Sequence, residues 1–100
     1  MENLTVVDNP AESQFEARAG DGGVVGFIAY DAGAAGPGVV VLTHTQVDPA
    51  HEGKGVGGEL ARGALDLIRA SGQQLVPLCP FVAAYLRRHP EYADLVRPTP

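Results

Sequence analysis

The sequence predicts an α+β fold: an antiparallel meander, followed by a parallel strand-helix-strand unit and a final helix. Two observations support this prediction. Alternating or β-branched segments separated by glycine-rich breaks fill the first half of the chain, whereas apolar residues at helical spacing fill much of the second half. A length of 100 residues, with 45% hydrophobic and 19% charged residues, suits one compact globular domain spanning residues 1–100.

The N-terminal half contains four predicted strands. They cover residues 4–8, 13–19, 24–31 and 39–47. The second alternates polar and apolar side chains, as a strand with one buried face does, and the third is apolar on both faces, as in a central strand. Asp21-Gly22-Gly23 and the glycine-rich segment 32–38 separate consecutive strands and predict hairpin turns. Four acidic residues are expected at the surface: Asp8, Glu12, Glu16 and Asp21.

The C-terminal half contains two predicted helices and one short strand. The first helix buries the apolar residues Leu60, Ala61, Ala64, Leu65 and Ile68, and Gly72 ends it. An apolar strand over 74–79 and a helix over 81–88, stopped by His89-Pro90, come next. A strand, a helix and a second strand imply a right-handed crossover between parallel strands. The tail 97–100 is expected to fray.

Pro77 gives a more specific prediction about the last strand. Proline has no backbone N–H and cannot donate a hydrogen bond within a sheet, so a fully paired central strand would lose one bond there. We therefore expect the 39–47 strand and the 75–79 strand to be neighbours that splay apart. The gap between them would expose unpaired backbone groups to a ligand.

Composition argues against several classes of function. The net charge is −5 and no Lys/Arg cluster exists beyond Arg87-Arg88, which disfavours nucleic acid as a partner. No apolar run is long enough for a membrane span, and the N-terminus has no signal-peptide pattern. A lone cysteine, Cys79, suits a reducing cytosol, so a cytoplasmic protein is expected. The spacing of His44, His51, His89 and Cys79 does not match a zinc site, so no metal is expected.

The stretch His51–Leu60, HEGKGVGGEL, places four glycines directly before the first helix. Glycine lets successive amides point into one concavity, and the helix N-terminus adds a positive dipole, so a phosphate is the expected ligand. The P-loop pattern is absent. Gly53, Gly55 and Gly58 match G-x-G-x-x-G, but the stretch does not follow a strand directly and lacks the later acidic residue of dinucleotide folds. A tight bend before a helix remains the structural alternative.

Two segments of the chain, HTQVDPAHEGKGVGGELARGALDLIRASG and VPLCPFVAAYLRRHPEYADLV, resemble the small single-domain members of the GNAT N-acetyltransferase superfamily. The Gln/Arg-x-x-Gly-x-Gly/Ala loop of that superfamily falls on residues 52–57, with Glu52 in place of Gln or Arg. The resemblance implies acetyl-CoA as co-substrate, with its pantetheine arm between the splayed strands. Residues implied in cofactor binding are Gln46, Val47, Glu52, Gly53, Lys54, Gly55, Val56, Gly57 and Gly58, where backbone N–H groups around Gln46 and Val47 would polarise the acetyl carbonyl.

Three residues are candidates for the chemistry of acetyl transfer. The resemblance implies that Tyr85, in the last helix, protonates the departing CoA thiolate; its alternative is an aromatic ring packed in the core. Cys79 would lie near the acyl group and could accept it covalently, or it could be a buried small apolar residue. His44 titrates in the range suited to a base, but alternation places it on the same face as Val40 and Leu42, where a core histidine is equally expected.

The sequence thus predicts an N-acetyltransferase that moves an acetyl group to an amine by direct attack. A non-catalytic CoA or acetyl-CoA sensor is the alternative, because Gln46 stands where an acidic base is often found in the superfamily. A route through acetyl-Cys79 is a further alternative. A protein lysine, a polyamine or a small exposed amine fits a domain of this size as the acceptor. Neither the identity of that amine nor the oligomeric state follows from the sequence.

Overall fold

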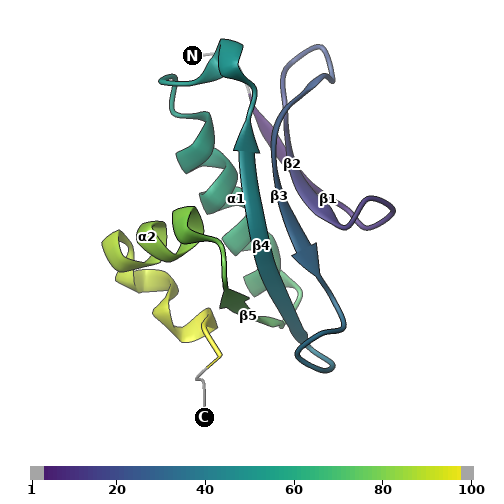
Figure 1. Cartoon of the computed structure of the whole chain (residues 1–100), viewed down its shortest axis with the longest axis vertical. Helices are drawn as coiled ribbons and strands as arrows, with labels where there is room; N and C mark the ends of the chain where they lie inside the picture. Colours follow the sequence, from purple (N-terminus) through teal and green to yellow (C-terminus); the bar gives the residue numbers. More distant parts are fainter. Residues whose placement is uncertain (1–3, 98–100) are drawn as a thin grey trace.

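The computed structural model describes residues 4–97. Five strands form one mixed sheet in the order β1-β2-β3-β4-β5 (Figure 1). The strands are β1 (Thr5–Asn9), β2 (Gln14–Arg18), β3 (Val24–Asp31), β4 (Val39–Val47) and β5 (Gln74–Pro77). The first four pair antiparallel in chain order, whereas β5 runs parallel to β4. The predicted α+β fold, a meander followed by a strand-helix-strand unit, is therefore confirmed.

Two helices and two short 3-10 segments complete the fold. They are η1 (Pro49–His51), α1 (Val56–Ala70), α2 (Pro80–Arg88) and η2 (Pro90–Leu95). The helix α1 connects β4 to β5 and packs its apolar stripe against the first three strands (Figure 1). The largest fully buried side chains belong to this core: Ile28, Leu42, Leu60, Leu65, Ile68, Leu75 and Val82. Within residues 4–97, no helix has both the length and the apolar character to cross a membrane.

The C-terminal segment folds back onto α1. The hydroxyl of Tyr92 donates a 2.7 Å hydrogen bond to Asp66. The guanidinium of Arg69 forms two bonds, of 2.8 and 2.9 Å, with the Asp94 carboxylate. The backbone N–H of Arg97 donates to the carbonyl of Leu75, so the chain also covers the outer edge of β5. The expected fraying of the tail concerns Pro98–Pro100, which lie outside the described residues, whereas Arg97 itself is bonded.

A β-bulge at Thr43 changes the face on which the end of β4 presents its side chains. Tyr30 pairs with Leu42, whereas the preceding residue Ala29 pairs with His44, so Thr43 is the extra residue. As a result, His44 leaves the apolar face that carries Leu42 and lies exposed on the opposite face. The prediction that His44 shares the face of Leu42 is wrong, because the bulge shifts the alternation by one residue.

We call the sheet face opposite α1 the outer face. Glu16, Phe27 and Gln46 lie opposite one another on β2, β3 and β4, so they share this face, whereas the next residue of β3, Ile28, belongs to the core beneath α1. His44 is also on the outer face. Its ring meets that of Phe27 edge-on, with 6.1 Å between the centroids.

Glu16 is buried on the outer face, which corrects the expectation that it lies at the surface. Only 3% of the residue is exposed. Its carboxylate accepts hydrogen bonds from Asn9 (2.9 Å), Gln14 (2.8 Å) and Arg18 (3.1 and 2.8 Å). The bonds from Gln14 and Arg18 hold the pKa of Glu16 below its usual value, against the opposing effect of burial. Strand alternation did not predict the burial of Glu16. This burial depends on polar side chains from two strands, which cover the carboxylate.

Replacing Glu16 by Gln is expected to lower the free energy of unfolding by about 1–2 kcal/mol at neutral pH, because hydrogen bonds to a charged acceptor are lost. Since the folded-state pKa lies below the unfolded one, this contribution is present above the unfolded value of about 4.3 and disappears as the pH falls through the folded-state value. Urea unfolding of both proteins across this pH range measures it. A difference between the two proteins that stayed constant with pH would contradict the assignment.

Candidate functional site

The strands β4 and β5 separate halfway along β4, as Pro77 predicted. Their pairing ends with Leu42 opposite Pro77, and the N–H of Cys79 donates a last 2.9 Å bond to the carbonyl of Leu42. Residues 43–47 of β4 have no partner on β5. Pro77 is thus the final paired residue of its strand. Its missing N–H does not interrupt the sheet hydrogen bonds, because the pairing with β4 ends there. The opening lies between the upper half of β4 and the helices α1 and α2 (Figure 1).

The backbone at the end of β4 presents unpaired groups to this opening. The N–H of Asp48 donates a 2.8 Å bond to the carbonyl of Val25 on β3. Because successive residues of a strand point their backbone groups to opposite sides, those of Gln46 also face β3. The backbone groups of Val47 and Thr45 therefore turn away from β3 and into the opening.

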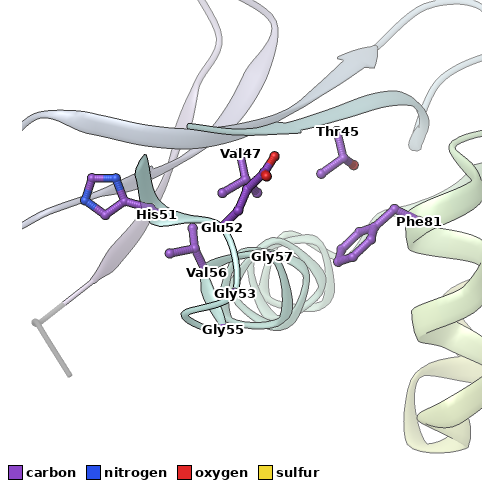
Figure 2. A pocket seen from close by; sticks show the side chains of 9 residues that line it. All are labelled: Thr45, Val47, His51, Glu52, Gly53, Gly55, Val56, Gly57 and Phe81. Atoms are coloured by element: carbon purple, nitrogen blue, oxygen red, sulfur yellow. The ribbon is translucent and has the colours of Figure 1, made fainter. Parts of the chain in front are cut away.

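A groove of about 310 Å³ occupies the opening. Figure 2 shows Phe81 reaching from α2 towards α1, with Thr45 and Val47 on the β4 side and the glycine turns below them. The residues that line the groove come from β4, from the loop before α1, from α1 and from α2: Thr45, Val47, His51, Glu52, Gly53, Gly55, Val56, Gly57 and Phe81. Six of the nine residues that the sequence implicates in cofactor binding line the groove. Lys54 and Gly58 adjoin these residues in the chain, and Gln46 does not belong to the lining.

The glycine loop directs a series of backbone amides away from the protein. Asp48 caps η1 by accepting a 2.9 Å bond from the N–H of Ala50. Gly53 and Gly55 both have φ +79°, a left-handed conformation in which other residues are strained. Within residues 4–97, no amide from Gly53 to Gly58 donates a hydrogen bond, and the first one to do so is that of Glu59, which bonds to Gly55. Free amides at the N-terminus of a helix form an anion-binding arrangement.

Gly57 allows the side chain of Phe81 on α2 to approach α1 closely. A Cβ built at this position would lie 2.9 Å from Cζ of Phe81, so the aromatic ring rests against bare backbone. Phe81 is 42% exposed and forms one wall of the groove. The side chains of Glu52 and Lys54 are exposed on the loop. A carboxylate at position 52 cannot donate to a phosphate, so backbone amides carry the anion-binding capacity of this loop.

Cys79 lies behind the groove rather than in its lining. It is the residue before α2, two positions beyond β5, so the prediction that it ends the strand is wrong by this margin. Its residue exposure is 3%, and its sulfur lies 3.0 Å from the hydroxyl of Thr45. The strand ends earlier than expected because β5 loses its partner where β4 and β5 diverge. Thr45 stands between the sulfur and the groove.

Tyr85 lies one helical turn after Phe81 on α2 and does not line the groove. Its ring stacks on His89 with 4.0 Å between centroids and 17° between planes. Burial raises the pKa of the Tyr85 hydroxyl, and the nearby Arg62 opposes that shift. The phenol therefore stays protonated at neutral pH and remains able to donate a proton.

The structure separates the three chemical candidates. Cys79 lies at the core side of the groove, Tyr85 lies between α2 and α1, and His44 is exposed on the outer face. Thr45 and Phe81, which sequence reasoning missed, line the groove instead. The bulge alone turns Thr45 inward, and no local sequence pattern predicts the bulge. Pro80 at the first position of a helix was a usable signal for Phe81, because it places that ring beside the end of the strand.

No group of three His, Cys, Asp or Glu side chains within residues 4–97 is arranged to hold a metal ion. The electrostatic features of the groove include its backbone amides, the dipole of α1 and the charges of Glu52 and Lys54. These features suit a ligand with an anionic end and a long uncharged arm. The glycine loop would take the anion, and the unpaired edge of β4 would take the arm through backbone hydrogen bonds.

Comparison with known proteins agrees with this geometry. Residues 14–95 match the profile of a family described as GCN5-related N-acetyl-transferase. The solution structure of a GCN5-like protein from Staphylococcus aureus has a TM-score of 0.68 at 21% identity, covering 100% of this chain and 94% of that one. A GNAT family acetyltransferase from Brucella melitensis, solved in complex with acetyl-CoA, has a TM-score of 0.57 at 35% identity. No curated protein matches the chain significantly.

The two structures support different statements. At 21% identity, the Staphylococcus aureus protein shows a shared fold over nearly its full length. The likeness to the Brucella melitensis protein covers 75% of this chain but only 49% of that one, so this chain spans about half the length of that relative. The family match covers most of this chain, including β2 to β5, the glycine loop and both helices. The chain therefore belongs to the GCN5-related N-acetyltransferase family.

Proposed function

We propose that the chain binds acetyl-CoA in the groove and transfers the acetyl group to an amine by direct attack. One observation carries the proposal: the gap between β4 and β5 leads to a helix N-terminus at which the amides from Gly53 to Gly58 donate no hydrogen bond within residues 4–97. The pyrophosphate would lie on those amides. The pantetheine arm would pair with the free edge of β4. The Brucella melitensis relative was solved in complex with acetyl-CoA, which supports acetyl-CoA as the ligand.

In the proposed reaction, the amine nitrogen attacks the thioester carbonyl carbon from the side of the outer face. The carbonyl oxygen becomes an oxyanion, which the backbone amides that face the opening at Thr45 and Val47 would stabilise. The C–S bond then breaks, the acetyl group stays on the amine, and the CoA thiolate takes up a proton. His44, exposed on the outer face, is the candidate base for the amine proton, and Tyr85 is the candidate acid for the thiolate.

Direct attack is favoured over the acetyl-Cys79 route by the position of the sulfur. With 3% exposure and a contact to the Thr45 hydroxyl, the thiol is enclosed by the protein. A thiol nucleophile also needs a neighbouring cation to stabilise its thiolate, and no Lys, Arg or His side chain in residues 4–97 bonds to this sulfur. Formation of an acyl-enzyme would require Cys79 to reach past Thr45.

Replacing Cys79 by Ser is expected to leave amine acetylation at the same order of magnitude, because serine keeps the contact with Thr45 and direct attack uses no thiol. Turnover is followed by the release of free CoA, and intact mass after incubation with acetyl-CoA alone detects any acetylated protein. An acetyl adduct on the wild type that disappears in the Ser variant, together with lost turnover, would establish the covalent route instead.

Turnover with a panel of amines tests the proposal as a whole. Acetylation of at least one primary amine, measured as CoA release and as mass gain of the amine, is the expected result. Tight binding of acetyl-CoA with no turnover on any protein, polyamine or small amine would identify a sensor. Failure of the folded protein to bind acetyl-CoA or CoA would reject both the acetyltransferase and the sensor proposals.

A further inference from the structure

A second cavity lies on the outer face, at the end of β4. This outer-face hollow has a volume of about 410 Å³. Phe27, Gln46 and Asp48 contribute an aromatic ring, an amide and a carboxylate to its lining. The remaining residues of the lining are small or apolar: Val24, Val25, Gly26 and Pro49. Neither the proposed cofactor site nor the proposed acetyl transfer uses this cavity.

The hollow and the groove share the strand β4 and lie on its two sides. Thr45 and Val47 line the groove, whereas Gln46 between them lines the hollow. His44, the candidate base, adjoins the hollow through its edge-on contact with Phe27. Asp48 lies four positions after His44 in the chain, so at about 3.3 Å per position the hollow ends roughly 13 Å from the base.

The chemistry of the hollow suits a positive charge. The Oδ1 atom of Asp48 accepts the cap bond from Ala50. The side chain is 46% exposed, and within residues 4–97 its second oxygen has no polar partner nearer than His51 at 4.0 Å. The ring of Phe27 offers an electron-rich face of the kind that attracts ammonium groups. No Lys or Arg is among the residues that line the hollow.

The other charged groups around the hollow leave this character intact. Arg18, which lies opposite Val24, is engaged by the buried carboxylate of Glu16. Asp21 and His51 line a neighbouring cavity that also includes Asp48. The Nδ1 atom of His51 is 4.0 Å from Asp48, so a protonated His51 would compete for the same carboxylate. The net charge of −5 adds a general attraction for cations.

We infer that the outer-face hollow binds a second cationic group of the acceptor, which makes the protein selective for amines that carry another positive charge at a distance. This inference rests on the proposed function, because it takes the position of the reacting amine from the site beside His44. The substrate class is a di- or polycation: a polyamine, or a peptide in which a second basic residue lies near the acetylated lysine. Asp48 and Phe27 then determine specificity and take no part in the acetyl transfer.

A chain-length series of diamines tests the inference. The acceptors are putrescine, spermidine, spermine and 1,10-diaminodecane, with butylamine and decylamine as monoamine controls. Only the longer acceptors span the roughly 13 Å between His44 and the end of the hollow. The longer diamines are expected to show a kcat/KM about three- to five-fold higher than that of the monoamines, the size of an exposed ion pair. Raising the salt concentration should reduce this preference. Lysine peptides with and without a second basic residue, compared in the same assay, distinguish a peptide source from a polyamine source.

Asp48→Asn is the variant that isolates the charge. Asparagine is as good a helix cap as aspartate, so the bond to Ala50 and the fold are expected to survive. The variant should lose the preference for the longer diamines, through a higher KM, while its kcat and its activity on monoamines stay unchanged. Equal use of monoamines and diamines by the wild type, or an unchanged preference in the variant, would overturn the inference. Absence of turnover on every amine would instead reject the proposed function.

Discussion

Gly58→Asp is expected to abolish most CoA binding while leaving the protein folded. Gly58 is the third residue of α1, and a Cβ at this position meets no atom within 4 Å. An acidic side chain in the first turn of a helix is favourable for the helix itself. It would also place a negative charge beside the proposed pyrophosphate. For two unit charges about 6 Å apart at an effective dielectric constant near 20, the repulsion is about 3 kcal/mol, or roughly 100-fold in affinity.

Gly58→Asn is the matched control, because it has the same shape without the charge. We expect its affinity for CoA, measured by titration calorimetry, to stay close to that of the wild type, and the melting temperatures of all three proteins to be similar. Gly55 is a poorer position for this test, since at φ +79° any side chain strains the backbone. A loss of CoA affinity could then come from impaired folding rather than from the added charge. Equal loss in the Asp and Asn variants would indicate crowding, and wild-type binding by both would place the phosphates elsewhere.

Gly63→Ala is expected to destabilise the protein by about 1–3 kcal/mol, the usual cost of overpacking a core contact. A Cβ at Gly63 would lie 2.5 Å from Cβ of Val6 and 2.6 Å from its Cγ2. Valine is branched at Cβ and cannot rotate those atoms away, so α1 and β1 must move apart. In an open helix position, the same change would stabilise the protein by up to about 1 kcal/mol. Urea unfolding measures the difference.

Gly58→Ala serves as the control for this second prediction. It makes the same chemical change in the same helix, at a position where the added methyl group has open space. Its unfolding free energy should equal or exceed that of the wild type. A Gly63→Ala protein as stable as Gly58→Ala would show that β1 adjusts freely. A double-mutant cycle with Val6→Gly should reveal a coupling energy, since this second change removes the atoms that the new methyl group meets.

In the proposed reaction, the outer face and the groove would hold the two substrates on opposite sides of β4. The cofactor would approach from the side of α1 and α2, and the acceptor from the side of His44, Gln46 and Asp48. Such a division would let a chain of 100 residues bind two substrates without a deep acceptor pocket. Strand alternation produces this division: Gln46 and Asp48 line the hollow, and Thr45 and Val47 line the groove.

Much of the fold could be predicted because its signals are local. Strand alternation, glycine-rich breaks and the helical spacing of Leu60, Ala64 and Ile68 depend only on neighbours in the chain. Pro77 predicted the separation of β4 from β5, since a residue without an N–H reports directly on backbone pairing. The glycines of residues 53–58 predicted a helix start with free amides for the same reason: conformation at these positions is set by the residue itself.

The tertiary structure decided everything that depends on how strands meet. The bulge at Thr43 arises between β3 and β4, and it alone moves His44 to the outer face and Thr45 into the groove. The burial of Glu16 requires Asn9 from a neighbouring strand, and the shielding of Cys79 requires Thr45, 34 positions away in the chain. Sequence thus determined the elements and the anion-ready loop, because backbone conformation is a short-range property. Register and side-chain burial are long-range properties, and only the packed sheet settles them.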